Sequence, residues 1–268
     1  MLAAGMRWLA KAALQKGISA LPRAESVNYA FQRHVSRSLP VREAGFRRKF
    51  RGALRHLVAY EDHGPRGRAG AAVFYELGAG WDLALQLSYW SLGVERQVLC
   101  DVRPNLRLEL VGVTLEHLRR LRPALERKTG RKLRDPGRAP VRSLEELEAR
   151  FGIVYLAPRD ARATGLDAGS VDFVSSTNTL EHVPADELVP ILLECRRLLR
   201  ADGVTSHRID LHDHFADFDA TLSPYNFLRH SDRTWALANS KLMYQSRLRR
   251  PDYLDAFSAA GFLVVGEK

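Results

Sequence analysis

The sequence has little cysteine. Only Cys100 and Cys195 occur among its 268 residues, both in apolar segments and without a CxxC pair. A disulfide framework or a thiolate metal site would need more cysteines at closer spacing. The scarcity of cysteine therefore fits a reducing compartment, and we expect a cytoplasmic protein.

The sequence also lacks a long hydrophobic run. A membrane-spanning helix needs about 20 consecutive apolar residues, but Arg7, Lys11 and Lys16 interrupt the nearest candidate, residues 1–21. The same charges argue against a secretory signal. The apolar residues of this segment share one helical face: Leu2, Met6, Leu9, Ala10, Ala13 and Leu14. Such a face predicts a helix that packs on a domain, with a membrane-surface helix as the alternative.

Acidic residues are scarce in the first quarter of the chain. Residues 1–70 contain 14 Lys and Arg but 4 Asp and Glu, whereas residues 71–268 contain 27 of each. A basic segment can contact anionic lipid or nucleic acid, but no nucleic-acid-binding motif accompanies this one. We expect a solvated, basic helical extension, with peripheral membrane contact as the alternative and no nucleic-acid partner. Nothing in the sequence indicates the oligomeric state.

Turn-forming residues divide the chain. The segment 63–70, HGPRGRAG, predicts a linker between an N-terminal helical extension, residues 1–70, and a main domain, residues 71–268. Short apolar segments alternate with helical ones in the main domain. The expected strands are residues 72–77, 97–102, 153–157, 171–177, 204–211 and 262–266. This alternation predicts an α/β fold, a doubly wound and mostly parallel sheet flanked by helices.

Several helices have clear signals. One runs from Pro184 to about Arg200, with apolar residues at helical spacing. The interval of about fifty residues before Ile153 exceeds one crossover helix and predicts two helices with an exposed loop. The second of these begins at Ser143, which has the spacing of a capping box with Glu146.

The most informative segment is residues 73–80, VFYELGAG. Two glycines after an apolar strand let the backbone approach a ligand closely, although a lone GxG also fits a plain strand-to-helix turn. Asp101 follows the next strand, where a carboxylate can accept hydrogen bonds from both hydroxyls of a ribose. These features predict a cofactor that contains a nucleoside.

Two residues argue against a dinucleotide cofactor. The third glycine of a GxGxxG motif would fall at Leu83. Glu76 places a carboxylate where a diphosphate would need backbone donors, and the two negative charges would repel. A cofactor that carries a sulfonium and an ammonium group would tolerate this carboxylate.

Further motifs follow in a fixed order. They are ELGAG, CDV, DAR at residues 160–162, VDFVSSTNTLEHVP and LLECRRLLRADGV. Over residues 72–211 the chain resembles the class I S-adenosylmethionine-dependent methyltransferases. The resemblance implies a Rossmann-like sheet, S-adenosylmethionine as cofactor and methyl transfer as activity. The cofactor-binding residues that it implies are Glu76, Gly78, Gly80, Asp101, Asp160, Ala161 and Asn178.

The glycine loop departs from the family pattern. The usual third glycine is replaced by Asp82, and Trp81 is bulky. We therefore expect a tighter or differently directed loop, with an effect on the strength of cofactor binding. This departure also keeps open the alternative of a non-catalytic protein that binds S-adenosylmethionine.

Three histidines are candidate catalytic residues. Methyl transfer from a sulfonium is an in-line displacement that requires alignment and exclusion of water, and a general base is needed only if the acceptor must lose a proton. His182 follows the fourth strand, and His212 and His214 follow the fifth. Because a similar run around His182 recurs across the superfamily, a purely structural role is the alternative.

A metal site is not expected. Glu181 and His182 are similar to ligands of metal-assisted family members that methylate polyhydroxylated aromatics, but the first carboxylate position there is Asn178 here. An amide is a weaker ligand. The later cluster of Asp210, His212 and His214 leaves three interpretations open: acceptor orientation or proton transfer, a metal site, or a hydrogen-bonded loop.

The segment 212–250 is long and aromatic, which predicts a lid over an acceptor pocket. Its arginines, Arg229, Arg233 and Arg247, suggest an acceptor with a flat or sugar-like face. We expect a small-molecule or lipid-linked acceptor, with a membrane-surface protein as a further alternative. The chain ends six residues beyond Phe262, so we expect either a truncated sequence or a sheet without the family's seventh strand.

Overall fold

The computed structural model describes residues 7–19, 21, 24–35, 38–65, 69–241 and 244–267. The chain forms two compact units. The sheet unit comprises residues 38–177 and 191–208, and the second unit comprises residues 1–37, 178–190 and 209–268.

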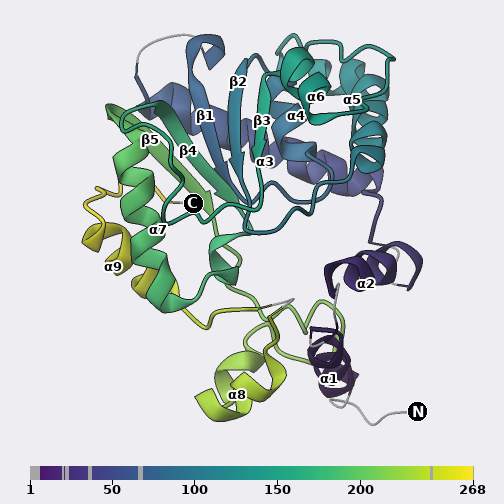
Figure 1. The fold of residues 1–268 in the computed structure, drawn as a ribbon, viewed down its shortest axis with the longest axis vertical. Coiled ribbons are helices and arrows are strands. Elements are labelled where there is room, and N and C mark those ends of the chain that lie inside the picture. The colour runs from purple at the N-terminus through teal and green to yellow at the C-terminus, as the bar shows by residue number, and fades with distance from the viewer. Residues whose placement is uncertain are drawn as a thin grey trace. The chain divides into compact units, whose positions relative to one another are not determined.

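The sheet unit contains five parallel strands (Figure 1). They are β1 (Val73–Leu77), β2 (Arg96–Cys100), β3 (Ile153–Leu156), β4 (Val171–Thr177) and β5 (Leu199–Arg208). Their order in the sheet is β3-β2-β1-β4-β5. The order reverses between β1 and β4, and a ligand of a doubly wound sheet binds at the carboxyl ends of the strands at such a reversal. The predicted α/β fold is confirmed.

One face of the sheet is covered by helices that the sequence places before and between the strands. They are α3 (Glu43–His63), α4 (Ala84–Ser91), α5 (Leu108–Thr129) and α6 (Leu144–Phe151). A short 3-10 turn at Ala69–Ala71 lies between α3 and β1. Phe74, Phe173 and Tyr60 form an aromatic cluster there, with the Phe74 and Phe173 ring centroids 4.7 Å apart. Fully burying one such ring contributes about 1.5 to 3 kcal/mol. Helix α3 therefore belongs to the core of the sheet unit.

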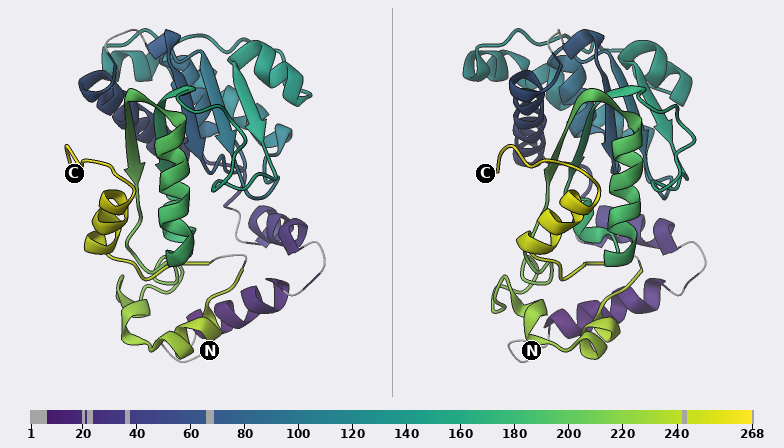
Figure 2. Two further views of the ribbon diagram at one scale, coloured as in Figure 1. Left: turned by 60° about the vertical axis from the view of Figure 1, so that its left-hand side comes forward. Right: turned by 90° about the vertical axis from the view of Figure 1, so that its left-hand side faces the viewer.

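The second half of α7 (Ala185–Leu198) covers the opposite face (Figure 2). Side chains alternate along a strand, so Tyr75 and Cys100 point away from α3 and lie with Cys195 of α7. The prediction of this helix was correct to within two residues at each end. Both cysteines are buried and free.

Two local predictions need correction. Ser143 caps α6 by accepting a hydrogen bond from the Glu146 backbone, but the Glu146 carboxylate accepts from the backbone N–H of Arg142, so the capping box is not closed. The expected strand at residues 262–266 is wrong, because the described residues 262–267 have no regular structure. The side chains of Leu263, Val264 and Val265 are exposed, that of Leu263 at 86%. An apolar run becomes a strand only beside a partner strand.

The second unit is mostly helical. It contains α1 (Arg7–Ser19), α2 (Ala24–Ala30) with a π-helical continuation at Phe31–Val35, 3-10 turns at Leu180–His182 and Asn226–Arg229, the start of α7, α8 (Asp232–Ala238) and α9 (Arg250–Ala259). Trp235 lies at the centre of its apolar core, with its ring 6.0 Å from Phe215 and 5.9 Å from Phe227. Among the described residues, no helix combines the length and apolarity needed to cross a bilayer.

The buried face of α1 is not the predicted one. Trp8 and Ala12 pack against the core around Phe215, whereas Leu9 and Leu14 are each 50% exposed. Tryptophan buries more area than leucine and decides which side of the helix packs. Leu2 and Met6 of the predicted face lie outside the described residues.

Candidate functional site

The loop after β1 has the backbone conformation that its glycines predict. Gly78 has a φ of 82° and Gly80 a φ of 72°, a region that favours glycine. A Cβ added at Gly80 would meet no atom within 4 Å. The loop therefore leaves room for a ligand beside its backbone.

Asp101 lies at the carboxyl end of β2, beside this loop. Burial raises the pKa of its carboxyl group to about 6, whereas hydrogen bonds from the backbone N–H groups of Arg103, Ala79 and Gly80 act in the opposite direction. The structure thus brings together the glycine loop and the carboxylate that the sequence predicts for ribose binding. Ala79 was not predicted, since a backbone donor has no side-chain signature.

The segment after β3 lies next to Asp101. The Asp101 backbone N–H donates to the Leu156 carbonyl (3.0 Å), and the Arg159 N–H donates to the Asp101 carbonyl (2.9 Å). This pairing places Asp160 and Ala161 in the adjoining loop. The Asp160 carboxylate is exposed and accepts a 2.8 Å hydrogen bond from Arg162, which holds its pKa below the ordinary value.

Glu76 is buried in β1. Its carboxylate accepts a hydrogen bond from the Ser175 hydroxyl, which in turn accepts from Tyr89 at 3.2 Å. Burial raises the pKa of Glu76 to about 8. Near neutral pH the carboxyl group is therefore largely protonated, in contrast to the charged group on which the sequence argument against a dinucleotide relied.

A partly buried ion pair stabilises the unusual glycine loop. Asp82, at the position of the family's third glycine, is 2% exposed, and its carboxylate oxygens lie 2.8 and 2.9 Å from the Lys49 ammonium. The neighbouring Leu83 has a positive φ of 50° and is fully buried. Sequence reasoning missed Lys49, because a partner 33 residues away in α3 leaves no local pattern.

The remaining predicted site residues belong to the second unit. Asn178, directly after β4, has a φ of 54° and donates from its amide to Asp210 at 3.4 Å. His212 Nδ1 lies 3.3 Å from Asp210 and its side chain is 61% exposed. The His214 side chain is 20% exposed, and its Nε2 lies 3.9 Å from Asp210.

His182 and His214 face each other. Their ring centroids are 5.1 Å apart, and His182 Nδ1 donates to the Tyr244 carbonyl at 2.6 Å. This hydrogen bond leaves the lone pair on Nε2. Burial lowers the pKa of His182, so the imidazole is neutral near pH 7. Such a nitrogen can accept a proton or bind a metal ion.

Glu181 joins the two histidines. One ligand atom each of Glu181, His182 and His214 lies within 4.8 Å of the others. Sequence reasoning tested the neighbouring residues Asn178, Glu181 and His182 as a ligand set. It placed His214 in a separate cluster with Asp210 and His212, because that residue is 32 positions away from His182.

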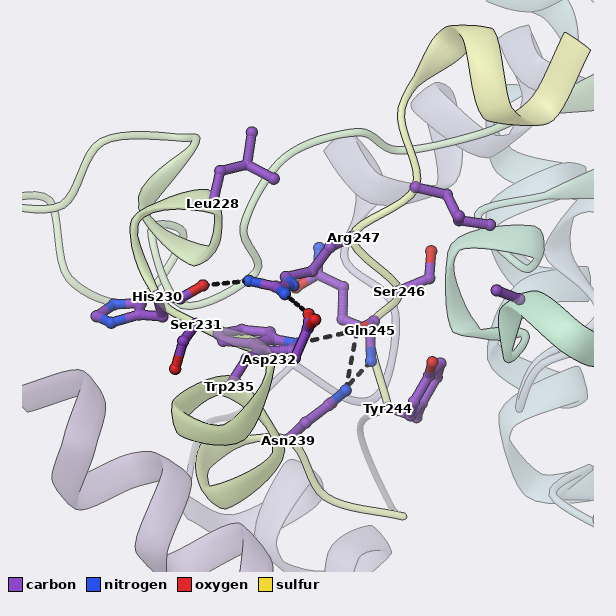
Figure 3. Close-up of a pocket in the computed structure, with 12 residues that line it drawn as sticks. Leu228, His230, Ser231, Asp232, Trp235, Asn239, Tyr244, Gln245, Ser246 and Arg247 are labelled. Carbon is purple, nitrogen blue, oxygen red and sulfur yellow. Dashed lines mark hydrogen bonds and ion pairs between the residues drawn. The ribbon is translucent and has the colours of Figure 1, made fainter.

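The second unit also contains a pocket of about 710 Å³ (Figure 3). Most of its lining comes from the predicted lid segment, of which residues 242–243 lie outside the description. Figure 3 shows Arg247 and Asp232 pointing toward each other, and Asn239 beside Gln245; Asn239 Nδ2 donates to the Gln245 carbonyl at 3.0 Å. Of the three predicted lid arginines, Arg247 lines the pocket, and Arg229 and Arg233 are exposed.

The chain matches one family model, described as "Methyltransferase domain", over residues 133–206. The match spans β3, β4 and β5 and does not include the glycine loop. No curated protein matches the sequence.

Several solved structures are similar. An S-adenosylmethionine-dependent methyltransferase from Leishmania major is 12% identical, with 97% of this chain and 75% of that chain covered and a TM-score of 0.45. One from Archaeoglobus fulgidus is 13% identical, with 80% and 69% covered and a TM-score of 0.42. A third, from Galdieria sulphuraria, is named provisionally as a sarcosine dimethylglycine methyltransferase; it is 17% identical over 60% of this chain, with a TM-score of 0.35, and the chain spans 46% of its length.

The family match over residues 133–206 and the β3-β2-β1-β4-β5 strand order are two independent observations. Both agree with the motif order in the sequence. Residues 133–206 therefore match a methyltransferase domain, and the β3-β2-β1-β4-β5 order of the sheet is the Rossmann-like fold that the sequence motifs predict.

Proposed function

We propose that the chain transfers a methyl group from S-adenosylmethionine to a small-molecule or lipid-linked acceptor. The observation that carries the proposal is the Asp101 carboxylate at the end of β2, at which the backbone N–H groups of Ala79 and Gly80 point. It lies at the edge of the sheet where doubly wound folds bind nucleosides. When bound, the cofactor supplies a methyl group activated for in-line displacement.

The chain's own residues would hold the cofactor. Asp101 would accept hydrogen bonds from the ribose hydroxyls, and Asp160 with the Ala161 backbone would contact the adenine. Gly78 and Gly80 would let the backbone approach the methionine portion, because the space beside Gly80 is open. Glu76 and Asn178 complete the proposed set, from the β1 strand and from the residue after β4.

The acceptor side is supported by the pocket of the second unit. Its volume of about 710 Å³ lies within the range of roughly 300 to 1,000 Å³ of small-molecule sites. Among the candidate bases, His182 has a fixed tautomer with Nε2 available, whereas His212 is exposed. His182, with His214 beside it, is the better placed to receive a proton from an acceptor.

Transfer of labelled methyl groups to small-molecule and lipid fractions tests the proposal. We expect incorporation that falls at least about tenfold in Asp101→Asn, since the ribose hydroxyls lose a charged acceptor. Asp167→Asn, at an exposed position, is the control and should retain activity. Cofactor binding without transfer to any fraction would contradict the proposal and favour the alternative of a non-catalytic S-adenosylmethionine-binding protein.

A second candidate function is peripheral membrane contact through α1. Leu9, Ala10, Ala13 and Leu14 form an exposed apolar stripe on this helix, and residues 1–70 are strongly basic. An amphipathic helix with such a stripe can lie at the surface of an anionic bilayer. The scarcity of cysteine supports a cytoplasmic location for this contact.

Sedimentation with anionic vesicles tests the membrane contact. Leu9→Asp with Leu14→Asp should abolish co-sedimentation, because both changes place charge in the stripe. Leu193→Asp is the matched control, since Leu193 of α7 is also 50% exposed. Equal sedimentation of the stripe variant and the control would exclude α1 as the contact.

A further inference from the structure

We propose that Glu181, His182 and His214 bind a divalent transition-metal ion such as Zn²⁺. Their ligand atoms lie within 4.8 Å of one another. Two imidazole nitrogens and one carboxylate oxygen are a donor set that suits Zn²⁺ and its neighbours in the first transition row, whereas Mg²⁺ and Ca²⁺ prefer oxygen ligands. The proposal goes beyond methyl transfer and does not depend on it.

The hydrogen bond of His182 is the first supporting observation. A metal-binding histidine almost always donates its other ring N–H to a carboxylate, a carbonyl or water, which fixes the tautomer and the direction of the ligating lone pair. His182 donates from Nδ1 to the Tyr244 carbonyl at 2.6 Å. The nitrogen available to a metal is therefore Nε2. The same lone pair could serve a general base, but the two other ligands beside it favour a metal.

One short segment anchors all three ligands. Besides the Tyr244 contact with His182, the Gln245 side-chain oxygen accepts from the His214 backbone N–H at 3.1 Å. The Ser246 backbone N–H donates to the Glu181 carbonyl at 2.8 Å. Residues 244–246 also line the 710 Å³ pocket. The ligand cluster is thus held by the pocket wall and lies beside the pocket.

A metal ion can reach the cluster from solvent, and a further carboxylate, that of Asp210, lies beside it. Glu181 is 1% exposed, but the His214 side chain is 20% exposed and gives a path for an ion. Asp210 lies 3.9 Å from His214 Nε2 and can orient that ring. Ligands of tetrahedral Zn²⁺ at ~2.1 Å lie ~3.4 Å apart, so His214, which is carried on a turn, moves inward on binding.

Three protein ligands leave a fourth position open, as in catalytic zinc sites. An oxygen bound there, from water or from an acceptor hydroxyl, would lose its proton more readily. This last step rests on the proposed function, but the metal site itself does not.

Calorimetric titration of the full chain with Zn²⁺, after removal of metals by a chelator and without S-adenosylmethionine, tests the site. We expect one equivalent to bind, and His214→Ala to weaken its affinity at least ~100-fold. His212→Ala is the matched control, because His212 is the same residue type two positions away and its side chain is 61% exposed. It should bind Zn²⁺ within a few-fold of the unchanged chain.

Glu181→Gln distinguishes the loss of a metal ligand from unfolding, because it preserves the shape of the side chain and removes only the charge. It too should bind Zn²⁺ more weakly, with an unchanged circular dichroism spectrum. Substitution with Co²⁺ should give a spectrum without sulfur-to-cobalt charge transfer. Absence of Zn²⁺ binding, equal affinity in His214→Ala, or a thiolate band from Cys100 and Cys195 would overturn the proposal. The titration is independent of the cofactor, so a failed methyl-transfer assay would not affect its result.

Discussion

Two histidines of the sheet unit, the buried His56 and the partly buried His207, have no role in the proposed chemistry. His56 of α3 bridges Ser206 (2.8 Å) and Thr177 (3.0 Å), and burial lowers its pKa to about 4. His207 of β5 lies 2.7 Å from the Ser176 hydroxyl, and burial lowers its pKa to about 3. Both rings are neutral at pH 7. Protonation of either ring would place an unsolvated charge in the core.

The stability of the fold should therefore depend on pH through His56. The unfolded chain binds the proton near pH 6.5, whereas the folded chain binds it near pH 4. The stabilisation is present above the unfolded pKa and is lost as pH falls toward the folded pKa. The free energy of unfolding contributed by this ring should fall by about 2 kcal/mol between pH 7 and pH 4.5.

Urea denaturation of the unchanged chain and of His56→Gln measures this contribution. The variant should be less stable at pH 7, and the difference should shrink by about 2 kcal/mol at pH 4.5. Glu76 and Asp101 act in the opposite direction, because burial raises their pKa values to about 8 and 6, but they are common to both chains and cancel in the comparison. His63→Gln, exposed on the same helix, is the control. A difference that is independent of pH would refute the assignment.

At the scale of elements, two glycines that follow helices differ in what surrounds them. Gly130 ends α5 with a φ of 67°, and Gly152 ends α6 with a φ of 63°. A Cβ at Gly130 would meet no atom within 4 Å, whereas one at Gly152 would lie 1.7 Å from the Glu95 carbonyl oxygen. The two positions therefore share a backbone conformation and differ in the available space.

Alanine substitution at these two glycines should distinguish the cost of backbone strain at a positive φ from the cost of a steric clash of the added Cβ. Gly130→Ala should cost about 1 to 2 kcal/mol of unfolding free energy, because alanine disfavours the left-handed conformation. Gly152→Ala should cost at least about 2 kcal/mol more, because the start of β2 must also move. Thermal unfolding followed by circular dichroism measures both. Equal losses would mean that the contact with Glu95 relaxes without cost.

The elements were largely predictable from the sequence, because periodicity and turn residues act locally. The strands β1 to β5 and the helix after Pro184 lie within a few residues of their predicted bounds, except that β5 begins five residues earlier. Two helices lie between β2 and β3, as expected. The failures depended on tertiary partners: the segment at 262–266 has no neighbouring strand, and the face of α1 was decided by packing of Trp8.

The candidate site was predictable only where one segment carries the chemistry. The glycine loop and Asp101 were found because each follows an apolar strand. The Lys49–Asp82 ion pair and the approach of His214 to His182 join residues 33 and 32 positions apart. Such pairs leave no periodic signal, and they become visible only in the folded chain.

At the level of the whole molecule, the two units contain different parts of the proposed functional set. Gly78, Gly80, Asp101 and the Asp160 segment belong to the sheet unit, whereas Asn178 and His214 belong to the second unit. If the contact between Asp101 and the ribose dominates the affinity for the cofactor, a substitution of Asp101 in the sheet unit should abolish cofactor binding. Cofactor binding should be retained when His214 in the second unit is substituted.

Cofactor binding is best measured through the melting temperature of the chain with S-adenosylhomocysteine and, separately, with NAD, each at about a hundredfold excess over the dissociation constant. Binding should add about 2.7 kcal/mol of stability, a rise of roughly 5 °C or more for a chain of this size. We predict this rise with S-adenosylhomocysteine alone, its loss in Asp101→Asn and its retention in His214→Ala. A rise in melting temperature with NAD instead, or an equal rise in Asp101→Asn, would contradict binding of S-adenosylmethionine through Asp101.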